Sequence, residues 1–173
     1  MSSSLASNPC LACTTNQSCC SRLSGLRLTK GEFESHFKKH SDRLSVVKYK
    51  KTFIVSALKN LSCPHWELGG CLIYHGRPVD CRLYPYEITK ISEKKRTVEV
   101  RFGANPGCPM PADLLMPVEQ AKKLIQGFCR NVYGPQGKQI VVTHLENPKG
   151  GGPRRSLIDP LIARISKILR SCR

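Results

Sequence analysis

The sequence predicts a small, irregular α+β domain whose short strands and helices are organised around cysteine metal sites, followed by a C-terminal amphipathic helix. Three observations predict this class. The 173 residues are enough for one domain with a hydrophobic core. Short β-branched segments alternate with segments of helical periodicity. Ten cysteines, most of them in two groups, fall largely between these segments.

The first elements are expected ahead of the second cysteine group. Thr29 and Glu32 have the spacing of a capping box, which predicts a short helix that ends near Lys39. The stretch 46–56 is rich in β-branched and aromatic side chains, and it predicts a strand or a hairpin leading toward Cys63.

Proline marks the next predicted element. Residues 77–84 are expected to form a helical turn, with Pro78 at its first position and Pro85 ending it. Residues 87–91 and 97–102 alternate in polarity, so we expect two strands separated by a charged turn.

A longer helix and a last strand complete the predicted domain. Residues 117–133 have apolar side chains at helical spacing, and residues 139–144 have the composition of a strand. Cys129 lies within this helix and is expected to be buried as a small hydrophobic residue. The apolar face of the helix contains Val118, Ala121, Leu124, Ile125, Phe128 and Val132.

Composition divides the chain into three parts. Residues 1–147 form the predicted cysteine-cluster domain, residues 148–155 a basic Gly/Pro linker, and residues 156–173 a cationic amphipathic helix. We expect this helix to dock on the domain, and contact with a partner or a membrane surface is the alternative. Its apolar stripe consists of Leu161, Ile165, Ile168 and Leu169.

The grouped cysteines are the strongest chemical signal in the chain. Thiolates are soft anionic ligands, so convergent cysteines suit zinc or an iron–sulfur cluster. Four thiolates complete one zinc site or one cubane cluster, which allows one or two sites. The first group contains Cys10, Cys13, Cys19 and Cys20, and the second contains Cys63, Cys71, Cys81 and Cys108.

Disulfides and reactive thiols are the alternatives to metal ligation. The N-terminal segment has neither the basic nor the apolar region of a secretory signal, so we expect a cytoplasmic chain with reduced thiols. His65 and His75 flank the second group and are alternative ligands, although we expect both to pack in loops. Arg77 and Arg82 are expected to lie beside the sulfur ligands, where they would offset negative charge and donate N–H bonds to sulfur.

The second cysteine group belongs to a longer pattern, which consists of Gly70–Cys71, Ile73–Tyr74, Arg77–Pro78, Cys81–Arg82, Tyr84–Pro85 and Cys108–Pro109. In these positions the chain resembles the signature of the CxxCxxCC family, the YkgJ-like zinc- or iron-chelating proteins, over about residues 10–110. The resemblance implies that all eight grouped cysteines ligate metal. The chain departs from the family in the longer stretch 14–18 before the Cys19–Cys20 pair.

The function predicted from these residues is metal binding, with the specific activity undefined and enzymatic activity left open. Flagellin lysine N-methylases are similar to this chain around the cysteine motif, which implies a cluster-dependent enzyme as one alternative. A zinc-stabilised basic module that binds nucleic acid or another partner is a second alternative. The formal net charge of +16 is compatible with acidic partners, nucleic acid included. No apolar run approaches the ~20 residues that span a bilayer, so we expect a soluble protein.

Overall fold

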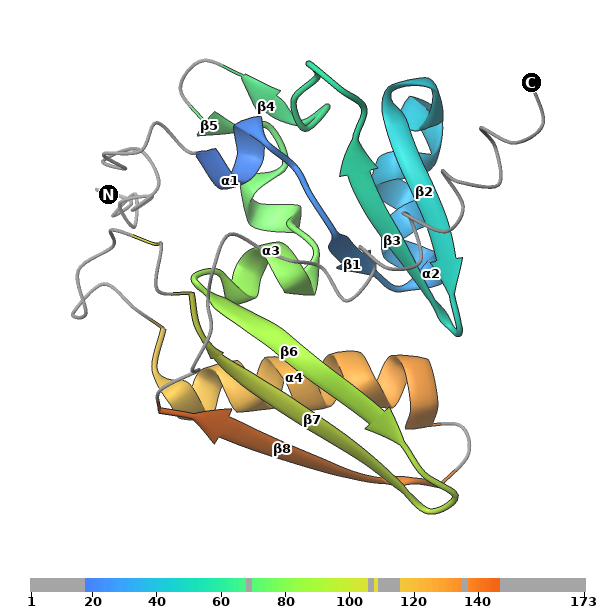
Figure 1. Ribbon diagram of the computed structural model, residues 1–173, viewed down its shortest axis with the longest axis vertical. Coiled ribbons are helices and arrows are strands. Elements are labelled where there is room, and N and C mark those ends of the chain that lie inside the picture. Colours follow the sequence, from blue (N-terminus) through green and yellow to red (C-terminus); the bar gives the residue numbers. More distant parts are fainter. Residues whose placement is uncertain (1–17, 68–69, 106–107, 109–115, 135–136, 147–173) are drawn as a thin grey trace, which may run out of the picture.

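The computed structural model describes residues 18–67, 70–105, 108, 116–134 and 137–146 (Figure 1). Strands and helices build two three-stranded sheets and a two-stranded hairpin, which confirms the α+β class. The first half contains α1 (Ser18–Ser21), β1 (Leu26–Leu28), α2 (Lys30–Glu32), β2 (Leu44–Tyr49), β3 (Thr52–Ala57), β4 (Trp66–Glu67) and β5 (Gly70–Cys71). The second half contains α3 (Val79–Leu83), β6 (Tyr86–Glu93), β7 (Thr97–Ala104), α4 (Val118–Tyr133) and β8 (Gln139–Leu145).

The first sheet has the strand order β1-β3-β2, and both pairings are antiparallel. The hairpin expected within 46–56 is confirmed as β2 and β3, which turn at Lys50 and Lys51. Lys50 adopts a positive φ of 54°, as a tight turn between two strands requires. The far end of the hairpin pairs Leu44 with Ala57.

The helical segment between β1 and β2 begins as predicted but continues differently. Thr29 forms the complete capping box with Glu32 at the start of α2. The chain is helical through the range expected to end near Lys39, but only its first turn is α-helical, because a π-helical turn (Phe33–Phe37) and a 3₁₀ segment (Lys38–Arg43) follow α2. Packing favours this irregular path: Phe37 is buried, and Phe33 stacks on Phe53 of β3 at 4.5 Å between ring centroids.

The second sheet has the order β6-β7-β8. β6 and β7 are antiparallel, whereas β8 lies parallel to β7 and is reached through α4. The strands, the long helix and the last strand are therefore confirmed. The parallel pairing of β7 and β8 was not predicted. Two parallel strands must be joined by a crossover segment, and α4 is that segment here.

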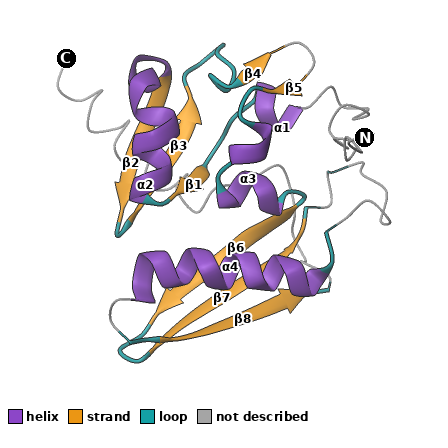
Figure 2. Cartoon of the chain, turned by 180° about the vertical axis from the view of Figure 1, so that it is seen from behind, coloured by secondary structure: helices purple, strands orange, loops and turns teal. Residues whose placement is uncertain are grey.

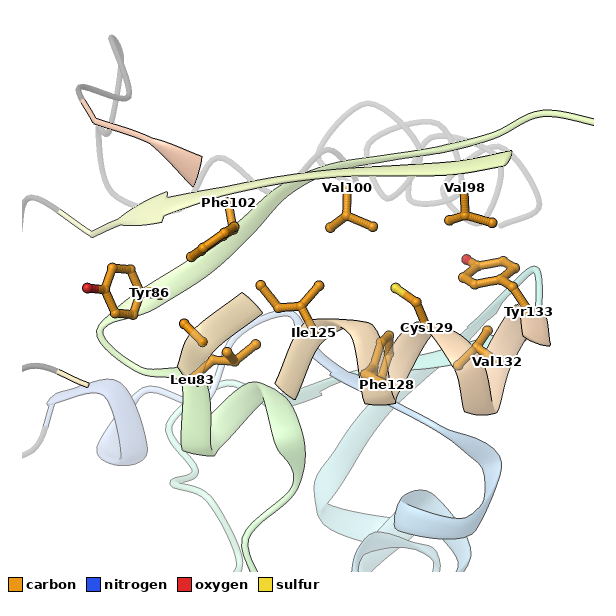
Figure 3. Packing of buried hydrophobic residues seen from close by; sticks show 11 residues of the cluster. Leu83, Tyr86, Val98, Val100, Phe102, Ile125, Phe128, Cys129, Val132 and Tyr133 are labelled. Atoms are coloured by element: carbon orange, nitrogen blue, oxygen red, sulfur yellow. The ribbon is translucent and has the colours of Figure 1, made fainter. Parts of the chain in front are cut away.

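α4 covers one face of this sheet and forms the main core with it. Val98, Val100 and Phe102 of β7 point toward the helix, and Ile125 and Cys129 point back toward the strand (Figure 3). All five side chains are completely buried. The predicted burial of Cys129 is confirmed.

α3 lies between the two sheets (Figure 2). Pro78 caps this helix from outside rather than occupying its first turn, and Pro85 follows its end as predicted. Leu83 of α3 belongs to the main core, while Cys81 packs against the smaller core beneath the first sheet. A single short helix thus connects the two hydrophobic clusters.

Several predicted features lie outside the described residues. They are Cys10 and Cys13, the linker 148–155 and the helix 156–173, so the three-part division of the chain stays a prediction. None of the helices in the described ranges combines the length and hydrophobicity needed to cross a membrane.

Candidate metal centre

Four segments that carry cysteines gather at one end of the first sheet. α1, the β4–β5 hairpin and α3 lie together there in both views of the chain (Figures 1 and 2). Cys20 lies in α1, Cys71 in β5 and Cys81 in α3. Cys63 lies in the loop that leads to β4. All four are partly buried.

Backbone contacts hold Cys20, Cys63 and Cys71 in place. The N–H of Cys63 donates to the carbonyl oxygen of Cys20 at 3.1 Å, which joins the two predicted groups. The N–H of Trp66 then donates to the carbonyl of Cys63 at 3.0 Å. Trp66 is the strand partner of Cys71. A short path of main-chain contacts therefore runs from Cys20 through Cys63 to Cys71.

His65 connects the loop before β4 to the residues around it. Its carbonyl accepts a hydrogen bond from the N–H of Leu72 at 2.9 Å, and its ring Nε2 lies 2.8 Å from the carbonyl oxygen of His36. The ring is buried and stacks edge-on against Phe37 and His40. Burial lowers the pKa of His65, so the neutral ring is favoured. His65 therefore packs in the loop as expected.

Two carboxylates fix α3, which carries Cys81. Oε1 of Glu32 accepts the N–H of Val79 at 2.7 Å, at the first residue of the helix. Oδ2 of Asp80 accepts the N–H of Arg27 in β1 at 3.0 Å. Sequence reasoning assigned Glu32 only to its capping box and gave Asp80 no role. Both contacts join residues far apart in the chain, so no local pattern announces them.

The thiols of the second group act on one another electrostatically. Burial raises the pKa of Cys81, and the neighbouring charges of Asp80, Cys63 and Cys71 raise it further. Three thiolates gathered in a partly buried place are unfavourable without a cation. A metal ion among them would supply the missing positive charge, because metal binding deprotonates thiol ligands.

Arg77 is the cation whose charge reaches Cys81 and lowers its pKa. Its guanidinium lies over the ring of Tyr74 at 3.8 Å, and its Nε donates to the carbonyl of Tyr74 at 2.9 Å. This places the side chain in a fixed position beside the cysteines. Arg82 is exposed on α3, and its expected contact with sulfur stays a prediction.

Cys108 approaches from the second sheet. The N–H of Asn105 donates to the carbonyl of Pro85 at 2.8 Å, and the N–H of Cys108 donates to the carbonyl of Asn105 at 3.1 Å. Pro85 closely follows α3, so these bonds connect the segment of Cys108 to the chain just after α3. Cys19 lies in α1 beside Cys20.

The donor set fits a soft metal in its chemistry, since Cys20, Cys63, Cys71 and Cys81 lie in neighbouring segments and thiolates are soft ligands. Cys71, Cys81 and Cys108 have free thiols. Within the described ranges, however, no three or more Cys, His, Asp or Glu side chains are already arranged to hold an ion. Cys10 and Cys13 of the predicted ligand set lie outside those ranges.

Comparison with known proteins returned no relative. No family model matches the chain, and neither a curated protein nor a solved structure matches it.

Proposed function

We propose that this protein binds zinc or iron through its grouped cysteines, at one or two sites, with an iron–sulfur cluster as one form of the iron-bound protein. The ligands in this proposal are Cys10, Cys13, Cys19, Cys20, Cys63, Cys71, Cys81 and Cys108. The resemblance to the YkgJ-like chelating proteins supports the same set. Thiol ligands must stay reduced, so we place the protein in the cytoplasm.

One observation carries the proposal. Cys20 and Cys63 belong to the two cysteine groups and are 43 positions apart by their numbering, yet their backbones are hydrogen-bonded at 3.1 Å. Burial raises the pKa of Cys81, and Cys63 and Cys71 both lie close enough to it for their charges to raise this pKa further. Four separate segments therefore bring partly buried cysteines to neighbouring positions, as a shared metal site requires.

The experiment is metal analysis and visible absorption spectroscopy of the full chain after anaerobic purification. Zinc leaves the protein colourless, whereas an iron–sulfur cluster absorbs visible light. We expect Cys71→Ser and Cys81→Ser to lose most of the bound metal. Cys129→Ala and Cys172→Ser serve as matched controls, because each removes a thiol from outside the proposed ligand set.

Metal content at the wild-type level in all four variants would overturn the proposal. The same loss of metal in all four variants would also overturn it, because the loss would then not depend on the proposed ligands. Circular dichroism of each variant shows whether its fold is intact. If Cys71→Ser fails to fold, Cys63→Asp replaces it in the test, because Asp keeps an anionic ligand at position 63. This variant still has to change the metal content or the absorption spectrum.

A further inference from the structure

Two hairpin turns lie at the end of the molecule opposite the cysteine segments. The β2–β3 turn and the β6–β7 turn are on the same side in both views, with the end of α4 between them (Figures 1 and 2). The first turn contains Lys50 and Lys51, and the second contains Lys94, Lys95 and Arg96. These turns belong to different sheets.

Contacts through α4 and β6 bring the turns together. The Nζ of Lys51 lies 5.5 Å from the ring centroid of Tyr133, at the end of α4. Lys138, Lys51 and Lys50 all act on the carboxylate of Glu93, at the end of β6, and lower its pKa. The Nζ of Lys138 is 2.6 Å from Oε1 of Glu93. The lysines of one turn therefore share an electrostatic environment with the end of the other hairpin.

The basic side chains at and beside the two turns form what we call the basic tip surface: Lys48, Lys50, Lys51, Lys94, Lys95, Arg96 and Lys138. Most of these side chains are exposed to solvent. Two carboxylates lie beside them, and each already pairs with a lysine: Glu93 with Lys138, and Glu99 with Lys94 at 2.5 Å. The positive charge of the surface therefore exceeds the negative charge of the neighbouring acids.

An aromatic ring stands in the middle of these charges. Tyr49 is 47% exposed, so part of its ring is open to solvent, and it lies between Lys48 and Lys50 in sequence. The Nζ of Lys50 lies 5.7 Å from the centre of the ring. Proteins bind single-stranded nucleic acid through exposed aromatic rings among lysines: the bases stack on the rings and the phosphates contact the cations.

We propose that the basic tip surface, with Tyr49 as its stacking platform, binds single-stranded nucleic acid. Phosphates would lie along the lysines of both turns, and one base would stack on Tyr49. A membrane surface fits less well, because it requires several apolar side chains next to the cations. Apart from Tyr49, the exposed large apolar side chain near the tip is Val141, the strand partner of Glu99. The exposed leucines Leu58, Leu61 and Leu72 belong to other parts of the chain, beyond the far end of β3 and next to β5.

The test is fluorescence anisotropy of the full chain with a labelled oligouridylate of about 16 nucleotides, over a range of salt concentrations. We expect Lys48→Glu/Lys95→Glu to weaken binding by at least about tenfold and to flatten its salt dependence. Tyr49→Ser should weaken binding by about tenfold while leaving the salt dependence unchanged. Lys38→Glu/Lys59→Glu is the matched control, since it changes the net charge equally at positions away from the turns.

The proposal is overturned if the wild-type chain does not bind the oligonucleotide. It is also overturned if the control pair weakens binding as much as the tip pair, because binding would then follow net charge alone. Binding to vesicles that contain anionic lipid, without binding to the oligonucleotide, would assign the surface to a membrane instead. Should the glutamate pair fail to fold, Lys48→Gln/Lys95→Gln must still show a smaller loss in the same direction.

Discussion

The carboxylate of Glu32 caps two helices that are far apart in the chain. Its Oε2 accepts the N–H of Thr29 at 2.8 Å and so completes the capping box of α2. Its Oε1 accepts the N–H of Val79 at 2.7 Å and so satisfies the first N–H of α3. Because α3 carries Cys81, this one side chain connects α2 to the candidate metal centre.

Glu32→Ala should therefore destabilise the protein by about 1–3 kcal/mol, since it removes a cap from each of two helices. The measurement is the free energy of unfolding in urea. Glu34→Ala is the control, because Glu34 is exposed and its nearest described cation is Lys30 at 3.8 Å; we expect a change within about 0.5 kcal/mol. Equal stability of the two variants would show that the contact with Val79 contributes nothing.

Arg77 and Arg82 should differ in their effect on the metal. Arg77 is held against Tyr74 and its charge acts on Cys81, whereas Arg82 is exposed. We expect Arg77→Gln to lower metal affinity by about tenfold, in the range of other residues that surround metal ligands. Arg82→Gln should have a smaller effect. Competition with a chelator measures both affinities, and the opposite order would refute the positioning of Arg77.

Cys129 should tolerate alanine better than serine. The side chain is completely buried between α4 and β7. A serine hydroxyl there would lose its hydrogen bonds to water, and its apolar surroundings would not replace them. Cys129→Ser is expected to cost about 1–3 kcal/mol, and Cys129→Ala less. Thermal unfolding of the two variants decides the order. A serine variant more stable than the alanine variant would contradict the apolar environment.

The same thiol predicts a pH dependence of stability. Burial raises the pKa of Cys129 from 9.0 to about 11. Since the folded state holds this proton more tightly than the unfolded chain does, the stabilisation is complete below about pH 9 and is lost as the pH rises toward about 11.

We therefore expect the stability difference between the wild type and Cys129→Ala to shrink over this range, by at most about 3 kcal/mol. Urea unfolding at several alkaline pH values measures the difference. Groups whose pKa does not depend on Cys129 titrate in both proteins and cancel in the comparison. Tyr133 does not cancel, because its pKa is raised by burial and further by the charge of Cys129, and this second contribution is part of the measured difference. A difference that stays constant across the range would contradict the raised pKa.

Much of the fold could be predicted from local pattern. The capping box at Thr29, the hairpin within 46–56 and the helix that ends at Tyr133 each rest on residues close in sequence, and all three are present. The π-helical turn (Phe33–Phe37) could not be predicted, because it accommodates Phe37 in a core that later strands build.

The sequence suggested candidate ligands but not the residues that hold their segments in place. Cysteine spacing singled out Cys63, Cys71 and Cys81 as candidates, since thiols are rare and chemically distinctive, and their ligation of metal stays a prediction. Glu32 and Asp80 hold α3 through contacts that join residues 47 and 53 positions apart, and carboxylates at such separations carry no local signal. Tertiary structure alone identifies them.

X-ray absorption at the zinc and iron edges shows whether the grouped cysteines ligate a metal. The sample is the full chain purified without oxygen. We expect a first coordination shell of sulfur at about 2.3 Å, with a reduced sulfur contribution in Cys81→Ser. A first shell of oxygen and nitrogen, unchanged in Cys81→Ser, would contradict ligation by the grouped cysteines.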